Sequence, residues 1–212
     1  MKKQRFLFLS VIVLTLLLAL FVNFSGFIFA IALLILITLF SLILIIKLIK
    51  GKQIKRLLKF TVTYSLIFIF GIIINLFIPY EKVSLGEDAT LSQEIQQIYK
   101  SDQSDRKLLK TYLIPENKKE VIERDNLRLE KAKNIYLDYT NGKEQLNNQD
   151  KFNLAMILHH GKTKEDFEIA HNLAKQVANS DNKIQNAEWL EKATYDRLQL
   201  SQGKPQKYGT QH

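Results

Sequence analysis

Several helices expected in the second half of the chain place ionisable side chains where a core residue belongs. The candidate catalytic residues in this set are His160, His171, Asp102, Arg106, Asp125 and Arg197. A buried charge costs several kcal/mol unless it is paired, so these groups are expected to meet one another or to line a cleft. A histidine with Asp and Arg partners could serve as a general base, and an arginine could hold an anionic substrate group.

Two interpretations of this set remain open. In the first, the groups form a satisfied ion-pair network that determines how the helices pack, and Arg128, which interrupts an apolar face together with Asp125, belongs to it. In the second, they line a polar cleft for a ligand or substrate. Perturbed titratable groups gathered in a cleft would favour the second interpretation.

The histidines do not predict a metal site. The pair at 159–160 and the Glu-x-x-His spacing at 168–171 suggest one, but a paired-metal bundle site needs that motif twice and the chain has one copy. The absence of cysteine removes thiolate ligands and disulfides. No phosphate-binding loop, dinucleotide fingerprint or Gly-x-Ser-x-Gly motif occurs, so neither a metal nor a cofactor is expected.

The end of the chain offers a second group of polar residues. Gly203 and Pro205 should end the last helix, and the candidate ligand-binding residues Gln206, Tyr208 and Gln211 follow. In one interpretation the tail folds back, with Tyr208 packing and Gln206 reaching the Asp–Arg cluster. In the other it is a structural clasp that closes the last helix pair.

Helices must position these residues, because apolar side chains recur at helical spacing and no stretch alternates convincingly as a strand. Expected helices cover one or two stretches within 88–113, then 118–140, about 148–160, 164–178 and 184–201. The sequence therefore predicts an all-α fold in which a small soluble domain consists of antiparallel helix pairs. Its alanine-rich pairs look like Sel1 and tetratricopeptide repeats.

Several short segments carry a family resemblance. They are 102–106 (Asp-Gln-Ser-Asp-Arg), 155–161 (Ala-Met-Ile-Leu-His-His-Gly), 165–166 with 170–174, 189–190 (Trp-Leu), 196–197 (Asp-Arg) and 203–211 (Gly-Lys-Pro-Gln-Lys-Tyr-Gly-Thr-Gln). The set, spanning about residues 94–211, resembles a family of uncharacterised bacterial proteins that end in Gly-x-Pro-Gln-x-aromatic-Gly-Thr-Gln. The resemblance implies a fold and candidate residues but no reaction. Family members often have Gln-His-Gly where this chain has His-His-Gly. The resemblance therefore implies that His160, and not His159, corresponds to the histidine of the family.

Three apolar runs precede this domain and predict a membrane anchor. They cover about residues 6–22, 27–46 and 60–78. At about 1.5 Å per residue, each run covers most or all of a hydrocarbon core about 30 Å thick. The expected domains are therefore an anchor at 1–79, with three transmembrane helices, and a soluble helical domain at 80–212.

Two alternatives concern the first run. The Asn-Phe-Ser-Gly segment at 23–26 predicts a tight hairpin between the first two spans, the alternative being a single kinked or re-entrant helix. The basic residues before the first run resemble the start of a signal peptide. The run is longer than usual for one and no small-residue cleavage site closes it, which favours a retained anchor.

The charge pattern predicts the orientation. The formal net charge is +9, the surplus positive charges all lie within the first 59 residues, and no acidic residue precedes Glu81. Basic residues collect on the cytoplasmic side, which places the amino terminus and the 47–59 loop inside and the domain after Pro79 outside. Attraction to anionic lipid accounts for the basic loop, so no nucleic-acid partner is expected. The many Lys, Ile and Asn residues suggest a bacterial source.

Three functions compete. The first is a multi-pass protein of the cell membrane whose extracytoplasmic helical domain binds a protein or peptide in a groove between helix pairs. The second is a membrane-tethered enzyme, perhaps a hydrolase, that uses the His/Asp/Arg cluster. The third, a transporter or channel component, is disfavoured because the spans are almost free of charge.

Overall fold

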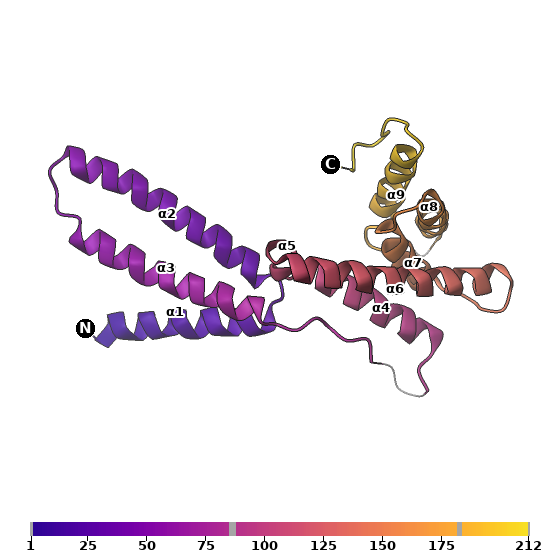
Figure 1. Ribbon diagram of the computed structural model, residues 1–212, viewed down its shortest axis with the longest axis horizontal. Coiled ribbons are helices and arrows are strands. Elements are labelled where there is room, and N and C mark those ends of the chain that lie inside the picture. Colours follow the sequence, from indigo (N-terminus) through magenta and orange to yellow (C-terminus); the bar gives the residue numbers. More distant parts are fainter. Residues whose placement is uncertain (1, 85–87, 182–183, 212) are drawn as a thin grey trace. The chain divides into compact units, whose positions relative to one another are not determined.

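The computed structural model describes residues 2–84, 88–181 and 184–211 (Figure 1). Within these residues the chain forms helices and connecting loops, with no strand. The prediction of an all-α fold is therefore confirmed.

The chain divides into two compact units. The first consists of Met1–Tyr80 together with Ser104–Lys118, and the second of Glu81–Gln103 together with Lys119–His212. The segment 104–118, which the sequence analysis assigns to the soluble domain, thus packs within the first unit. The division into an anchor at 1–79 and a soluble domain at 80–212 stays a prediction.

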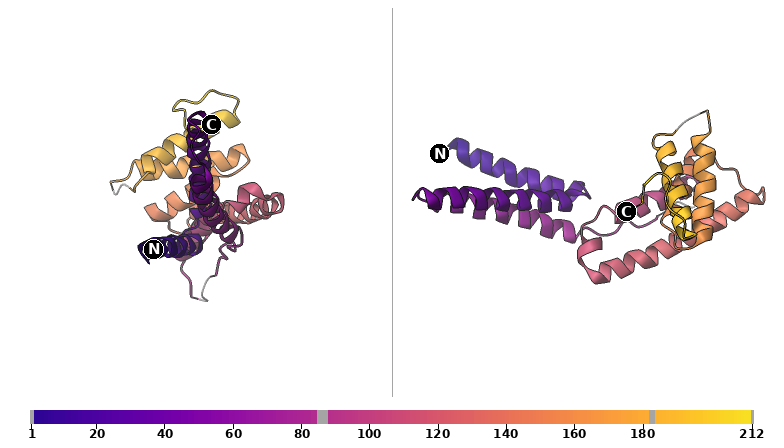
Figure 2. Two further views of the ribbon diagram at one scale, coloured as in Figure 1. Left: turned by 90° about the vertical axis from the view of Figure 1, so that its left-hand side faces the viewer. Right: turned by 90° about the horizontal axis from the view of Figure 1, so that it is seen from above.

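The first unit contains three long helices, α1 (Lys2–Phe21), α2 (Ser25–Ile49) and α3 (Lys55–Leu76), and the short helix α5 (Lys110–Leu113). Helices α1 and α2 are antiparallel and are joined by the turn at residues 22–24, as predicted for a hairpin (Figures 1 and 2). Helix α3 packs against both of them. The alternative of a single kinked helix is therefore wrong, since α1 and α2 are separate helices.

Among the residues that the structure describes, two helices, rather than the three predicted, are long and apolar enough to cross a membrane. These are α2, with 25 residues, and α3, with 22. Little of either is buried, 6% of the most apolar part of α2 and 17% of that of α3, which is unlike a core helix of a soluble protein. In α1 the apolar stretch Phe8–Phe21 is shorter than the about 20 residues that span a bilayer.

Gly71 lets the three long helices approach closely. A Cβ atom at this position would lie 2.8 Å from two ring carbons of Phe29 on α2 and 2.9 Å from Cγ2 of Thr15 on α1. A small residue at a contact between helices allows such a close approach.

The second unit contains most of α4 (Leu91–Asp105) and α6 (Pro115–Thr140), together with α7 (Asn148–His159), α8 (Lys164–Ala178) and α9 (Ala187–Ser201). Capping boxes start α7, through Asn147 and Asp150, and α8, through Thr163 and Asp166. Helix α6 begins at the proline rather than at residue 118, since proline suits the first position of a helix.

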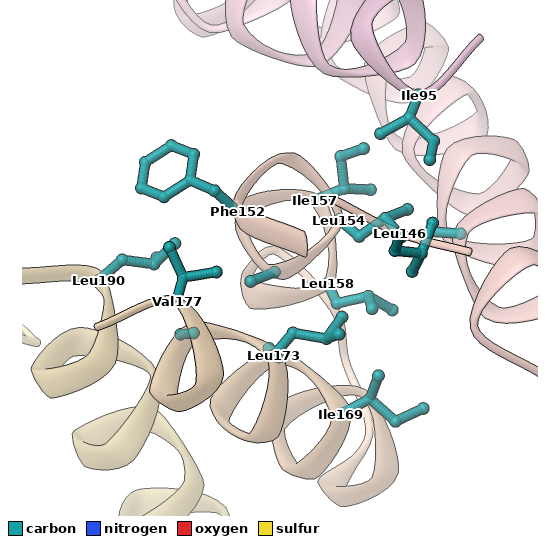
Figure 3. Close-up of a cluster of buried hydrophobic side chains, with 14 of the residues drawn as sticks. Ile95, Leu146, Phe152, Leu154, Ile157, Leu158, Ile169, Leu173, Val177 and Leu190 are labelled. Atoms are coloured by element: carbon teal, nitrogen blue, oxygen red, sulfur yellow. The ribbon is translucent and has the colours of Figure 1, made fainter. Parts of the chain in front are cut away.

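Helix α8 packs against both α7 and α9, which gives the predicted antiparallel pairs. Their core is built from large aliphatic side chains (Figure 3). Ile169, Leu173 and Val177 follow one another along α8, and Leu154 and Leu158 of α7 are completely buried. The same cluster includes Ile95 of α4, so this core also holds the helix that carries Asp102. The likeness to Sel1 or tetratricopeptide repeats stays a prediction.

Candidate functional site

A pocket of about 420 Å³ lies between α4 and α6 in the second unit. Its lining combines four basic side chains with three apolar ones and a serine: Lys82, Val83, Ile98, Ser101, Arg124, Leu127, Arg128 and Lys131. No acidic residue belongs to this lining. We call this feature the α4/α6 groove.

Ser101 on α4 organises the basic wall of the α4/α6 groove. Its hydroxyl oxygen accepts hydrogen bonds from Nη2 of Arg124 and from Nη1 of Arg128, both at 3.0 Å. The hydroxyl itself donates to the carbonyl of Glu81 at 3.3 Å, and Arg124 Nη2 donates to the same carbonyl at 2.6 Å. The two guanidinium groups are therefore held in place beside one another, which concentrates positive charge at the groove.

Acidic groups behind the wall balance part of this charge. Arg128 is 6% exposed, and its Nη2 donates to Oδ1 of Asp125 at 2.6 Å. Its Nε lies 3.8 Å from Oδ1 of Asp102, which is almost fully buried. Oδ2 of Asp102 lies 3.1 Å from Nδ1 of His160, the residue that caps the carboxyl end of α7.

The structure thus joins three of the six predicted catalytic residues, Asp102, Asp125 and His160, in one network through Arg128. Sequence reasoning placed Arg128 on an apolar helix face but did not select it as a site residue. Its burial and its position between two carboxylates make it the centre of the network.

The other three candidates lie elsewhere. Arg197 on α9 donates from Nη1 to the carbonyl of His159 at 2.7 Å. His171 on α8 has its Nδ1 3.4 Å from Oγ1 of Thr194, and burial lowers the pKa of its imidazole. Arg106 belongs to the first unit, where its carbonyl accepts a hydrogen bond from Tyr112.

The terminal tail folds back on α9, and Asp196 holds it there. Its carboxylate accepts hydrogen bonds from the backbone N–H groups of Lys207, Tyr208 and Thr210 and from the hydroxyl of Thr210, at 2.8–3.1 Å. Burial alone would raise the pKa of Asp196, but these hydrogen bonds outweigh it and hold the pKa at about 2. Sequence reasoning did not select Asp196 as a site residue, because its contacts with backbone groups 11 to 14 residues further along the chain leave no local signal.

The amide side chains of the tail bond mainly to the tail itself and to α9. Nε2 of Gln206 donates to the carbonyl of Gln211, whose own N–H donates to Oε1 of Gln206, both at 2.7 Å. Gln211, rather than Gln206, reaches the basic group, since its Oε1 accepts from Nε of Arg197 at 2.8 Å. Tyr208 packs edge-on against the ring of Tyr195. This geometry is that of a clasp, and ligand binding by the tail stays a prediction.

Within the described residues, no group of three or more His, Asp or Glu side chains is arranged to hold a metal ion.

The chain was also compared with known proteins. No family model, no curated protein and no solved structure matches it. The resemblance to the bacterial family with the Gly-x-Pro-Gln ending therefore stays a prediction.

Proposed function

We propose that this protein is a membrane-anchored interaction module whose extracytoplasmic helical unit binds an acidic, partly apolar segment of a protein partner in the α4/α6 groove. The observation that carries the proposal is the lining of this groove, where four basic side chains and three apolar ones meet and no acidic side chain is part of the lining; Asp125 and Glu94 pair with Arg128 and Lys131 from outside it. The lipid bilayer is the second partner.

The membrane topology is part of the proposal. Helices α2 and α3 have the length and composition of spans, and α1, which packs against α3, would be a third crossing with its flanking residues. The basic residues of the 47–59 loop would remain at the cytoplasmic leaflet. This places the amino terminus inside and the α4/α6 groove outside.

The chemistry of the groove suits a carboxylate. A guanidinium group presents paired donors that match the two oxygens of a carboxylate. Arg124 is half-buried and is positioned through Ser101, while the nearly buried Arg128 holds the same serine and adds positive charge behind it. Leu127, 67% exposed at the rim, and the buried Ile98 offer an apolar surface next to these charges. An Asp or Glu followed by an aliphatic residue would satisfy both parts of the groove.

Photo-crosslinking of the full-length chain in its own membranes tests this function. A photoreactive phenylalanine analogue replaces Leu127 in the groove, and the matched control carries it at Leu137, which is on the same helix and 55% exposed. We expect an adduct from position 127 alone, attached to a partner peptide rich in Asp or Glu.

Reversal of one charge makes the test specific. Lys82→Glu places an acidic group in the lining and should strongly reduce the adduct from position 127, because the partner would then meet a like charge. Equal adducts at 127 and 137, or an adduct that Lys82→Glu leaves unchanged, would contradict an acidic partner in the groove.

The contact between Asp102 and His160 favours hydrolysis as a second candidate function. Asp102 holds Nδ1 of His160, and Nε2 makes no hydrogen bond within the described residues, so that nitrogen could accept a proton from water. A panel of model esters, amides and phosphoesters would test it. Turnover lost in His160→Gln but retained in His171→Gln would support the hydrolase, whereas no turnover on any of the three classes would remove its support.

A further inference from the structure

The segment Ser104–Lys118 is fixed at one end of the first unit, where the α1–α2 turn meets the end of α3. Nδ2 of Asn23, in the turn, donates to Oγ of Ser104 at 2.9 Å. The ammonium group of Lys110 donates to the carbonyl of Ile78 just after α3, and lies 3.8 Å above the ring of Tyr80. The chain therefore returns to the helix bundle after leaving it.

The turn itself is packed without spare room. Asn75 near the end of α3 is fully buried, and its Nδ2 donates to the carbonyl of Asn23 at 3.2 Å and to Oγ of Ser25 at 3.1 Å. A Cβ atom at Gly26 would lie 2.3 Å from Oδ1 of Asn75 and 2.9 Å from Cβ of Leu109. Residue 109 thus contacts the turn directly, which makes the attachment of the segment tight.

Beside this attachment the first unit exposes a group of large apolar and aromatic side chains. Tyr112 is 60% exposed and Phe77 is 82% exposed. The ring of Phe27 lies edge-on to Tyr112 at 5.6 Å and stacks on Phe24 at 4.9 Å. We call this group, which also contains Leu113, the aromatic collar.

We propose that the aromatic collar sits in the lipid headgroup region of the extracytoplasmic leaflet and holds residues 109–114 on the membrane surface. The inference rests on the proposed membrane insertion of the bundle. Aromatic rings with one apolar and one polar side are enriched at this depth. The ring of Tyr112 is exposed, and its hydroxyl donates to the carbonyl of Arg106 at 3.1 Å, so its polar end is satisfied by the chain itself.

Continuity with the proposed spans favours lipid over a protein as the occupant of this surface. The collar lies where α2 begins and α3 ends, at the opposite ends of these helices from the 47–59 loop. Helix α2, at about 1.5 Å per residue, is about as long as a bilayer is thick, so the collar and the basic loop fall at the two interfaces. Exposed leucines and isoleucines of α2 extend the same apolar surface into the hydrocarbon region.

Tryptophan quenching tests the collar in the full-length chain, reconstituted in vesicles of phosphatidylcholine and phosphatidylglycerol. Trp189→Phe removes the single native tryptophan, and one tryptophan is then introduced at Tyr112. The lipids carry bromine on the acyl chains, either near the carbonyl end or near the middle of the bilayer. Leu34→Trp, at an exposed site within α2, is the control for insertion, and Leu137→Trp is the control for water.

We expect Tyr112→Trp to be quenched at least about twofold more by the shallow bromines than by the deep ones, Leu34→Trp to show the reverse, and Leu137→Trp to be unaffected. Absence of quenching at 112, or stronger quenching there by deep bromines, overturns the collar while quenching at 34 still supports membrane insertion. Absence of quenching at 34 overturns the insertion itself. Unchanged circular dichroism and thermal unfolding of each variant confirm that the fold is intact.

Discussion

Oδ2 of Asp102 lies 3.1 Å from Nδ1 of His160, and this contact ties α4 to the carboxyl end of α7 within the second unit. The other oxygen of the same carboxylate faces Nε of Arg128 on α6 at 3.8 Å. One buried aspartate thus connects three helices, and the guanidinium that balances it is also part of the wall of the α4/α6 groove. One residue, Arg128, thus belongs both to the buried network and to the lining of the groove.

Arg128→Met should lower the free energy of unfolding by about 3–5 kcal/mol, because it removes a buried cation that lies beside the carboxylates of Asp102 and Asp125. Denaturant unfolding followed by the fluorescence of Trp189 measures it. Lys131→Met is the control, since its lysine pairs with Glu94 but is 46% exposed, and should cost less than about 1 kcal/mol. Equal effects of the two substitutions would show that the buried network is not important for stability.

Asp196→Asn should release the terminal tail and lower the free energy of unfolding by about 1–3 kcal/mol, because the carboxylate that accepts the backbone donors is lost. Limited proteolysis at residues 203–211 and denaturant unfolding report the two effects. Asp181→Asn, at an exposed site, should change neither. A tail that stays equally protected in Asp196→Asn would contradict the clasp.

Asp196 should also make the free energy of unfolding depend on pH in the acid range. Its pKa falls from 3.8 in the unfolded chain to about 2 in the folded one, so its contribution to stability is complete above pH 3.8 and is lost as the pH falls through 2. The stability difference between the natural chain and Asp196→Asn should therefore shrink across that window. A difference that stays constant from neutral pH down to pH 2 would contradict the assignment.

His171 should make the second unit less stable below neutral pH. Burial lowers the pKa of its imidazole from 6.5, against an opposing effect of Glu191, so the unfolded chain takes up a proton more readily than the folded one. Stability from this group is present above pH 6.5 and is lost as the pH falls towards the folded pKa. In unfolding titrations, His171→Gln should weaken this loss, whereas Asn172→Gln next to it should leave the loss unchanged.

Gly71→Ala should loosen the bundle of α1, α2 and α3 and cost about 1–3 kcal/mol, because its Cβ would overlap the ring of Phe29. Thermal unfolding in detergent measures the change. Ile73→Val, on the exposed side of the same helix, is the control and should have little effect. Full stability of Gly71→Ala would mean that the helices do not approach each other as closely as the structure places them.

Local sequence patterns predicted much of this fold, but they did not predict contacts between segments that are far apart in the chain. The turn at 22–24 depends on neighbours within a few residues and was predicted from the Asn-Phe-Ser-Gly segment. The capping boxes at Asn147 and Thr163 are equally local in origin. The burial of Asn75 against the turn at residue 23 depends on chain segments about fifty residues apart, for which a single sequence carries no signal.

In the candidate site, too, the local pattern was predictable and the contacts between helices were not. The apolar face of α6 indicated that Arg128 is buried, because residues at helical spacing share one side. Its bond to Ser101 on another helix, and the role of that serine as a common acceptor for two arginines, follow only from how α4 and α6 pack. The return of residues 104–118 to the first unit likewise results from tertiary contacts.

The central claim is that the α4/α6 groove belongs to a unit outside the cytoplasm, carried by spans that leave the 47–59 loop inside. The natural chain contains no cysteine, so single cysteines can be labelled without background. In intact cells, a membrane-impermeant maleimide should label Asn141→Cys, at an exposed site in the turn after α6, and should label Lys52→Cys only after permeabilisation. Labelling of Lys52→Cys in intact cells, with Asn141→Cys protected until the membrane is opened, would contradict the account.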